Sequence, residues 1–282
     1  MLWENLREEE FAGAVETSKG LCVLPIGCIE KHGQHLPIGT DYLHAAAIAR
    51  LAAEKEPCVV FPTLLSGEKT GAGEFNGTVI YSAELRLMIL KETCHEIARN
   101  GFKKILLLNG HGGNTAMLQF FTRSVLYDKD PGFMIFTAGI GLPKAEKILE
   151  KNYPYLTAED KAIWQEYIDT GRSKKGGHGD FVETGMTYGT DPETVRLDRM
   201  DAESGLSTHL FDPFTALGIQ THFAWMGNYP NSYTSDYQPG MNERIARSIV
   251  DCAVEEAAEK FAFLKNETIS DAYFEDWKKK QK

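Results

Sequence analysis

Three short stretches of the sequence combine histidines with carboxylates at spacings that suit the binding of metal ions. The first stretch, GCIEKHGQHLPIGTDYLH, places Glu30, His32, His35 and Asp41 within twelve residues of one another. Glu30 and His32 are two residues apart, so their side chains share one face of an extended segment. Asp41 begins an expected helix, and capping alone would explain an aspartate there. Capping does not explain the Glu-x-His pattern before it, which therefore points to metal binding.

The second and third stretches each surround a histidine with glycines. The sequence NGHGGN, residues 109–114, lets the backbone turn tightly around His111. Glycine-rich turns between a strand and a helix also bind phosphate. This stretch, however, matches neither GxGxxG nor GxxxxGK followed by Ser or Thr, and its central histidine favours a metal. The third stretch, GGHGDFVETG, adds His178, Asp180 and Glu183.

Imidazole and carboxylate ligands together bind divalent cations, and two cations need several such ligands and often a shared carboxylate. On spacing alone, one zinc ion with spare carboxylates is an open alternative. Mixed nitrogen and oxygen ligands suit Zn, Mn, Fe or Ni. A water between two cations loses a proton near neutral pH and attacks a carbonyl carbon, so we expect hydrolysis. A metal-binding protein without catalysis is disfavoured, because structural sites favour four strong ligands, commonly cysteines.

Secondary structure must position these stretches, and the sequence predicts alternating strands and helices. Short apolar runs predict strands at 20–26, 58–61, 104–108 and 133–138. Helical spacing of apolar residues predicts helices at 42–55, 83–100, 115–127 and 242–264. Such alternation predicts a parallel sheet covered on both faces, with ligands beyond the carboxyl ends of its strands. Because the first two stretches directly follow strands, we expect them to meet at that edge.

The composition of the 282-residue chain is that of a globular protein and excludes several partners. Lys plus Arg is 30 and Asp plus Glu is 40, and the resulting net charge of -10 argues against nucleic acid. The N-terminus lacks the apolar core of a signal peptide, and no run reaches the ~20 apolar residues of a membrane span. The five cysteines form no CxxC pair, which indicates a reduced, cytoplasmic protein.

We expect a single domain, residues 1–282, with a polar helical insertion at about 143–177. The helices of the insertion are expected to be exposed, although they carry an aromatic set that includes Trp164. The insertion is open to interpretation as a lid, a subunit contact or a surface feature. An aromatic, turn-rich stretch follows at 208–238, and the tail ending in WKKKQK is expected to fray.

Taken together, the motifs E-x-H-G-x-H-L-P with the following Asp41, N-G-H-G-G-N, and H-G-x-x-x-E-T resemble the creatininase (creatinine amidohydrolase) family. The similarity runs over most of residues 20–250 and includes G-E-F-N-G-T at 73–78, where the family commonly has H-x-F-P-G-T. The resemblance implies a three-layer α/β/α sandwich with a mostly parallel central sheet, assembled as a homo-oligomer, usually a hexamer. It also implies two divalent metal ions per subunit (Zn, Mn or Fe) and a small-molecule substrate.

By this resemblance, Glu30 and His111 match ligands of one metal, and His32 matches a ligand of the other. Asp41 matches the carboxylate that bridges the two metals. In creatininase a glutamate within the N-G-H loop completes the second metal, and that position is Gly113 here.

Glu183 is the expected substitute, because family members with N-G-H-G-G-N also retain the glutamate of H-G-x-x-x-E-T. His178 matches a histidine that shuttles protons, and the ordinary pKa of histidine suits it to protonate a leaving nitrogen. We expect His35 to hydrogen-bond near the centre, and the sequence leaves open whether it or Asp180 touches a metal. Cys28 is not expected to be a nucleophile, because no Cys-His-Asn arrangement accompanies it.

The resemblance implies a metal-dependent hydrolase in which a hydroxide bound by two metals attacks the carbonyl of a cyclic amide or related small substrate. The expected bonds are C–N bonds other than peptide bonds. Creatinine is not expected, since the tyrosine and tryptophan that close over its ring in creatininase are Gly112 and Lys174 here. Ring opening of a cyclic keto-inositol and removal of a formyl group from a pyrimidine nucleotide are alternatives. Outside the hydrolases, a metal-dependent isomerase or lyase would use the same centre without consuming water.

Overall fold

The centre of the computed structural model is a parallel sheet, and the structure describes residues 1–127, 131–174, 177–234 and 238–280. Within those ranges, four strands lie in the order β2-β1-β3-β4 and pair in parallel throughout. The strands are β1 (Leu21–Ile26), β2 (Val59–Val60), β3 (Lys104–Asn109) and β4 (Met134–Gly139). The parallel sheet predicted from the alternation of apolar runs and helices is therefore confirmed.

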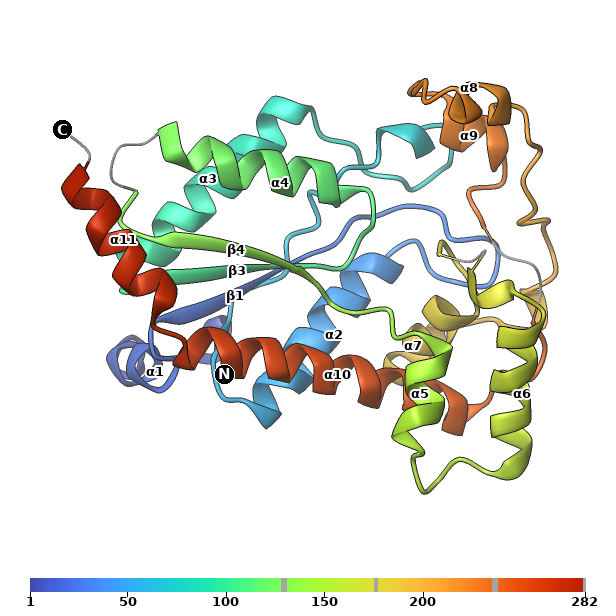
Figure 1. Cartoon of the computed structure of the whole chain (residues 1–282), viewed down its shortest axis with the longest axis horizontal. Coiled ribbons are helices and arrows are strands. Elements are labelled where there is room, and N and C mark those ends of the chain that lie inside the picture. Colours follow the sequence, from blue (N-terminus) through green and yellow to red (C-terminus); the bar gives the residue numbers. More distant parts are fainter. Residues whose placement is uncertain (128–130, 175–176, 235–237, 281–282) are drawn as a thin grey trace.

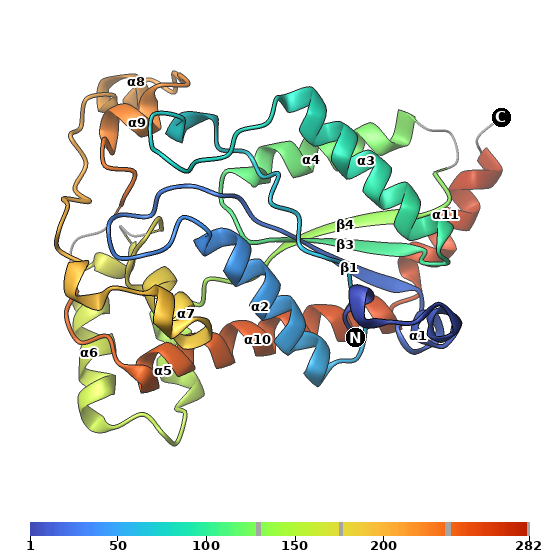
Figure 2. The same ribbon diagram turned by 180° about the vertical axis from the view of Figure 1, so that it is seen from behind.

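Helices cover both faces of this sheet (Figure 1). On one face lie α3 (Ala83–Arg99) and α4 (Asn114–Ser124). On the other face lie α2 (Thr40–Lys55) and α10 (Glu243–Asn266), as the view from behind also shows (Figure 2). The three-layer α/β/α sandwich is confirmed.

The strand β1 shows why the sheet sits at the centre. All six of its residues are buried. Leu21 and Val23 belong to the apolar cluster that includes α2 and α10, whereas Cys22 and Leu24 belong to the cluster that includes α3 and α4. Alternate residues of a strand point to opposite faces, so a strand covered on both faces must be apolar throughout.

The remaining helices flank the sandwich. They are α1 (Phe11–Thr17), α5 (Ala145–Lys151), α6 (Ala158–Asp169), α7 (Phe181–Thr190), α8 (Asp212–Ala216), α9 (Ala224–Asn228) and α11 (Ile269–Lys280). Short 3-10 segments lie at Trp3–Asn5, Glu8–Glu10, Thr70–Ala72, Val125–Tyr127, Arg172–Lys174, Pro192–Thr194 and Leu197–Arg199. Among the described residues, no helix combines the length and the apolar character that a membrane crossing requires.

The insertion at 143–177 contains α5 and α6, and the expectation of exposed helices is wrong for one side of them. Trp164 is completely buried and packs edge-on against Phe181 of α7, with ring centroids 5.5 Å apart. Asp160 of α6 is paired with Arg244 of α10, whose Nε lies 2.6 Å from the Asp160 Oδ2. The insertion therefore docks against α7 and α10, and its residues 175–176 lie outside the described ranges.

The C-terminal tail forms the helix α11, so the expectation of a frayed tail is wrong for residues 269–280. Lys104 at the start of β3 is buried, and its Nζ lies 2.6 Å from the Glu267 Oε1 and 3.0 Å from the Asp271 Oδ2. A buried ammonium needs such partners, and the two carboxylates fix the start of α11 against the sheet. Residues 281–282 lie outside the described ranges.

Candidate metal centre

The first two histidine-containing stretches meet where β1 and β3 end, as predicted. The register pairs Ile26 with Asn109, the last residues of the two strands. The backbone then passes close to the start of α2. A Cβ at Gly27 would lie 2.5 Å from a backbone nitrogen of α2, and one at Gly110 would lie 2.8 Å from the carbonyl oxygen of Asp41. Glycine permits these close approaches, and they bring Asp41 between the two loops.

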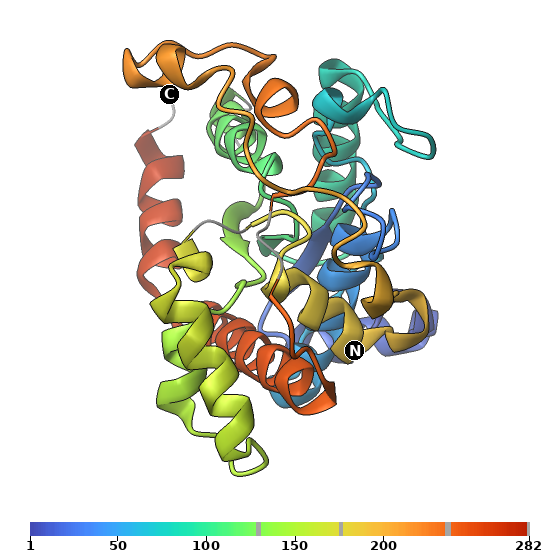
Figure 3. The same ribbon diagram turned by 90° about the vertical axis from the view of Figure 1, so that its right-hand side faces the viewer.

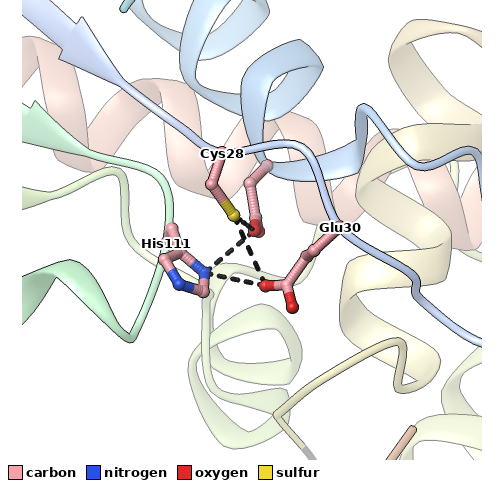
Figure 4. A group of neighbouring side chains, drawn as sticks. Cys28, Glu30 and His111 are labelled. Carbon is pink, nitrogen blue, oxygen red and sulfur yellow. Dashed lines mark hydrogen bonds and ion pairs between the residues drawn. The ribbon is translucent and has the colours of Figure 1, made fainter. Parts of the chain in front are cut away.

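Four buried residues form the first candidate metal site, which we call site A: Cys28, Glu30, Asp41 and His111. The His111 Nδ1 lies 3.1 Å from the Glu30 Oε1 and 2.9 Å from the Asp41 Oδ2. The Cys28 Sγ lies 3.0 Å from the same Asp41 oxygen and 3.4 Å from the same Glu30 oxygen (Figure 4). Each residue thus offers one potential ligand atom within 4.8 Å of the other three.

A second candidate site, which we call site B, consists of His32, Asp41 and Glu183. The His32 Nε2 lies 3.4 Å from the Asp41 Oδ1 and 3.7 Å from the Glu183 Oε2. Asp41 therefore turns one carboxylate oxygen toward each site. Glu183 lies in the first turn of α7, whose N-terminus is capped by the Asp180 side chain.

The rings of His111 and His32 are oriented so that one nitrogen of each is available to a metal. The Nε2–H of His111 donates to the carbonyl of Glu68 at 2.7 Å, and the Nδ1–H of His32 donates to the carbonyl of Glu30 at 3.1 Å. A carbonyl oxygen only accepts, so in the neutral rings the opposite nitrogens carry the lone pairs that face the carboxylates. Backbone carbonyls commonly orient metal-binding histidines in this way.

Burial and charge shift the pKa values of several groups in the centre. Burial raises the pKa of Glu183 to about 8. Burial also acts to raise the pKa of Asp41, but the neighbouring His111 and His32 rings hold it well below its usual range. Burial acts to lower the pKa of His32, and the Asp41 and Glu183 carboxylates together raise it by more. Divalent cations would offset the negative charge of these buried acids, and imidazole with carboxylate suits Zn or Mn.

His178 lies beside both sites. Its ring centroid is 4.1 Å from that of His32, and its Nε2 is 3.7 Å from the Glu30 Oε2. The Nε2–H donates to the carbonyl of Lys31 at 2.8 Å, which places the lone pair of the neutral ring on Nδ1. Burial lowers the pKa of His178 well below its ordinary value, so the ring is neutral at pH 7. Glu30, His32 and His178 form a third group of potential ligands, so the structure brings all six predicted site residues together.

His35 and Asp180, whose metal contacts the sequence left open, have other partners. The His35 Nε2–H donates to the carbonyl of Gly179 at 3.1 Å, and the Thr184 hydroxyl lies 2.9 Å from the same nitrogen. Asp180 accepts two backbone N–H groups of α7 and the hydroxyl of Tyr167. Among the described residues, neither His35 nor Asp180 belongs to a group that could hold a metal.

Two residues of the centre, Cys28 and Lys69, were not among the predicted site residues. The Lys69 Nζ lies 2.5 Å from the Glu30 Oε2 and 5.2 Å from the ring centroid of Trp225. Burial lowers the pKa of Lys69 to about 8. Cys28 had a signal in the sequence, because positions 28, 30 and 32 alternate along one extended segment. Lys69 had none, because a long irregular connection between β2 and α3 carries it.

A pocket of about 670 Å³ borders both sites. Its wall includes Lys69, His111, His178, Glu183, His222, Trp225 and Tyr229. The segment that carries α8 and α9 runs over the side of the molecule where the strands end (Figure 3). Gly112 also lines the pocket, and a Cβ there would meet nothing within 4 Å, whereas Lys174 is exposed.

Comparison with known proteins finds a matching family model and similar proteins. The family model described as "Creatininase: Creatinine amidohydrolase" matches residues 4–261. Creatinine amidohydrolase of Pseudomonas putida is 25% identical over 210 residues, which cover 70% of this chain and 74% of that protein. Mycofactocin precursor peptide peptidase of Mycolicibacterium smegmatis is 33% identical over 125 residues, which cover 40% of this chain and 49% of that protein.

Solved structures show the same fold. A structure titled "Creatininase Mn" superimposes with a TM-score of 0.71 at 19% identity and covers 94% of this chain and 99% of that one. A mutant creatininase described as "Zn-Zn type" gives a TM-score of 0.70 at 20% identity and covers 94% of this chain and 98% of that one. At these identities the likeness establishes the α/β/α architecture.

Proposed function

The chain belongs to the creatininase family, and on this basis we propose that it uses two divalent cations to hydrolyse a small cyclic amide or a related substrate. Membership of the family makes the protein a hydrolase of amide bonds. The observation that carries the two-cation proposal is the position of Asp41, which faces His111 with one carboxylate oxygen and His32 with the other.

The proposal assigns five ligands. Glu30 and His111 would hold one cation, His32 and Glu183 would hold the other, and Asp41 would bridge the two. Gly113 offers no ligand atom in its side chain, and Glu183 supports the proposal by reaching site B from α7 instead. The family resemblance and the imidazole and carboxylate donors favour Zn or Mn, with Fe as a further candidate.

Bound there, two divalent cations would supply hydroxide at neutral pH and would polarise the carbonyl of the substrate. We assign to His178 the transfer of the proton to the leaving nitrogen. Its Nε2–H is engaged with the carbonyl of Lys31, so the neutral ring accepts a proton at Nδ1 and can then donate it. Because the side chain lines the pocket, it lies within reach of a bound substrate.

The walls of the pocket support a proposal for the substrate class. Gly112 leaves one wall open, and Trp225 and Tyr229 provide apolar surface. The ammonium of Lys69 adds a positive charge beside Glu30. We therefore propose a small amide with one apolar face and an acidic or strongly polar group that contacts Lys69. Hydrolysis of a peptide is the second candidate, because the mycofactocin precursor peptide peptidases match part of the chain.

We also propose that the whole chain acts as one domain within a homo-oligomer, a hexamer by family resemblance. Large apolar side chains are exposed around α8 and α9: Leu206, Leu210, Phe214, Leu217, Ile219 and Phe223. Burying such a surface against another subunit is favourable. Light scattering on the purified protein measures the oligomeric state.

The cytoplasmic location expected from the sequence is supported by all five cysteines being free thiols.

A substrate screen tests the proposed activity. Protein loaded with Zn²⁺ or Mn²⁺ would be incubated with cyclic amides, N-formyl compounds, cyclic polyol ketones and short peptides, with products identified by mass spectrometry. We expect an amide to be hydrolysed, a chelator to stop the reaction and added metal to restore it. In ¹⁸O-labelled water the product should gain one solvent oxygen. Turnover without that oxygen would assign the centre to an isomerase or lyase instead.

A further inference from the structure

Cys28 is a completely buried member of site A, although the two-cation proposal gives it no role. Its Sγ approaches the Asp41 Oδ2 at 3.0 Å and the Glu30 Oε1 at 3.4 Å. These are the same two oxygens that face the His111 Nδ1, at 2.9 Å and 3.1 Å. One sulfur, one nitrogen and two oxygens therefore converge from three separate segments of the chain (Figure 4).

The separations of these atoms suit a tetrahedral zinc ion. Zinc lies ~2.3 Å from sulfur and ~2.0–2.2 Å from nitrogen or oxygen, so neighbouring ligand atoms around it are roughly 3.2–3.7 Å apart. The four pairs measured here are 2.9 to 3.4 Å apart. These four pairs need to move apart by only a few tenths of an ångström to admit the ion, and the other two pairs lie within 4.8 Å.

A thiol hydrogen bond alone does not account for this arrangement. The single proton of Cys28 can be donated to only one of the two carboxylate oxygens that its sulfur approaches. One further polar atom of the centre, the His32 Nε2, lacks a hydrogen-bond partner among the described residues, and His32 is completely buried. Unsatisfied buried polar atoms are costly, which favours cations as the missing partners.

We propose that Cys28 is the fourth protein ligand of site A. The inference rests on the proposed two-cation centre and adds a division of labour between its sites. On binding, the thiol proton leaves to solvent and a sulfur–metal bond forms, with no change of oxidation state. Four protein ligands close site A, as in structural zinc sites, whereas the three ligands of site B leave a position open for substrate. A thiolate also biases site A toward zinc and away from manganese.

Cobalt substitution tests the proposal without any substrate. The full-length chain would be freed of metal, titrated with Co²⁺ and followed by absorption spectroscopy. We expect the first equivalent to produce a thiolate-to-cobalt charge-transfer band in the wild type and in the control Cys22→Ala, a buried cysteine of β1 outside the centre. Cys28→Ser should lack the band. Losing a hydrogen bond that supports a ligand typically lowers metal affinity by ~10–100-fold. Because Cys28→Ser loses a ligand itself, its affinity for Zn²⁺ should fall by more than this, and its affinity for Mn²⁺ should change less.

Each outcome decides between the proposals. Cobalt bound by the wild type without a charge-transfer band would remove Cys28 from the coordination sphere and leave the two-cation centre standing. A chain that binds neither Co²⁺ nor Zn²⁺ would overturn both proposals. Should Cys28→Ser fail to fold, zinc-edge X-ray absorption of the wild type decides. A sulfur neighbour at ~2.3 Å supports the ligand, and a shell of nitrogen and oxygen alone rejects it.

Discussion

The Nε2 of His32 lies 3.4 Å from the Oδ1 of Asp41, and that ring nitrogen has no hydrogen-bond partner among the described residues. The other ring nitrogen of His32 donates to a backbone carbonyl, so the neutral ring points a lone pair at a carboxylate. The two groups repel each other unless a proton or a cation lies between them. A histidine that a backbone carbonyl orients so that its lone pair faces a carboxylate is typical of a metal site.

Asp41→Asn should release both cations, because one carboxylate serves site A and site B. Elemental analysis of the purified variant should find metal falling from two ions per chain toward none. Glu54→Gln is the matched control, since Glu54 lies on the same helix with its side chain exposed. Circular dichroism confirms that the variant is folded. Full metal content in folded Asp41→Asn would show that Asp41 does not bridge.

Glu183→Gln should remove one cation and spare the other. The substitution replaces a negatively charged ligand of site B by a neutral amide, whereas Cys28, Glu30 and His111 of site A are unchanged. Metal analysis should therefore find one ion per chain. Retention of both ions, or a structure of the loaded protein with Glu183 turned away from the metals, would contradict the assignment.

His178→Ala should keep its metals and lose activity. Loss of a general acid or base typically lowers the rate by ~10²–10⁴-fold. The measurement is kcat on the best substrate from the screen, together with metal content. The loss should shrink for a substrate whose leaving group needs no proton. Metal lost in proportion to activity would make His178 a ligand, and the assignment of Glu183 would then need revision.

Creatinine should be a poor substrate. By the family resemblance, the two aromatic side chains that close over its ring in creatininase correspond to Gly112, which leaves open space in the pocket, and to the exposed Lys174. We expect kcat/KM for creatinine to stay below ~10⁴ M⁻¹s⁻¹, the lower end of the range typical of enzymes acting on their own substrates. A higher value, measured with the metal-loaded protein, would show that other residues supply the ring contacts.

The ion pair at the start of α11 should make stability depend on pH. Burial acts to raise the pKa of Glu267, but Lys104 and Ser270 lower it by more, to about 2. The stabilisation is therefore fully present above the ordinary pKa of glutamate and is lost as the pH falls toward 2. Glu267→Gln should lower the free energy of unfolding at pH 7 by about 1–3 kcal/mol. In urea titrations that difference should be smaller at pH 3 than at pH 7. The exposed Glu259→Gln should change little at either pH.

Much of the sheet and most of the candidate site could be predicted from the sequence. The strands β1 and β3 are apolar on both faces, which leaves little ambiguity about a buried parallel sheet. Glu30, His32 and His111 lie in the loops that follow these strands, and Asp41 begins the helix after β1, so the topology places them together once the strands are neighbours.

Contacts between distant segments could not be predicted. Trp164 lies on a helix with many charged residues, and its burial depends on where α7 and α10 lie. Lys69 reaches the centre from an irregular connection with no periodic pattern to locate it. The position of the helix α11 depends on Lys104, which donates to the carbonyls of Leu264 and Glu267. These residues lie 160 and 163 positions later in the chain. In each case a partner far away in the chain decides the outcome, and local spacing carries no information about it.

The origin of the ligands in the chain also sets an order of assembly. Every side chain of site A lies within residues 28–111, whereas site B is incomplete until residue 183. As the polypeptide leaves the ribosome, the donors for the first ion are all synthesised before β4, and those for the second only after the insertion and the start of α7. A nascent chain that stops after β4 therefore carries a complete set of donors for one ion and an incomplete set for the other.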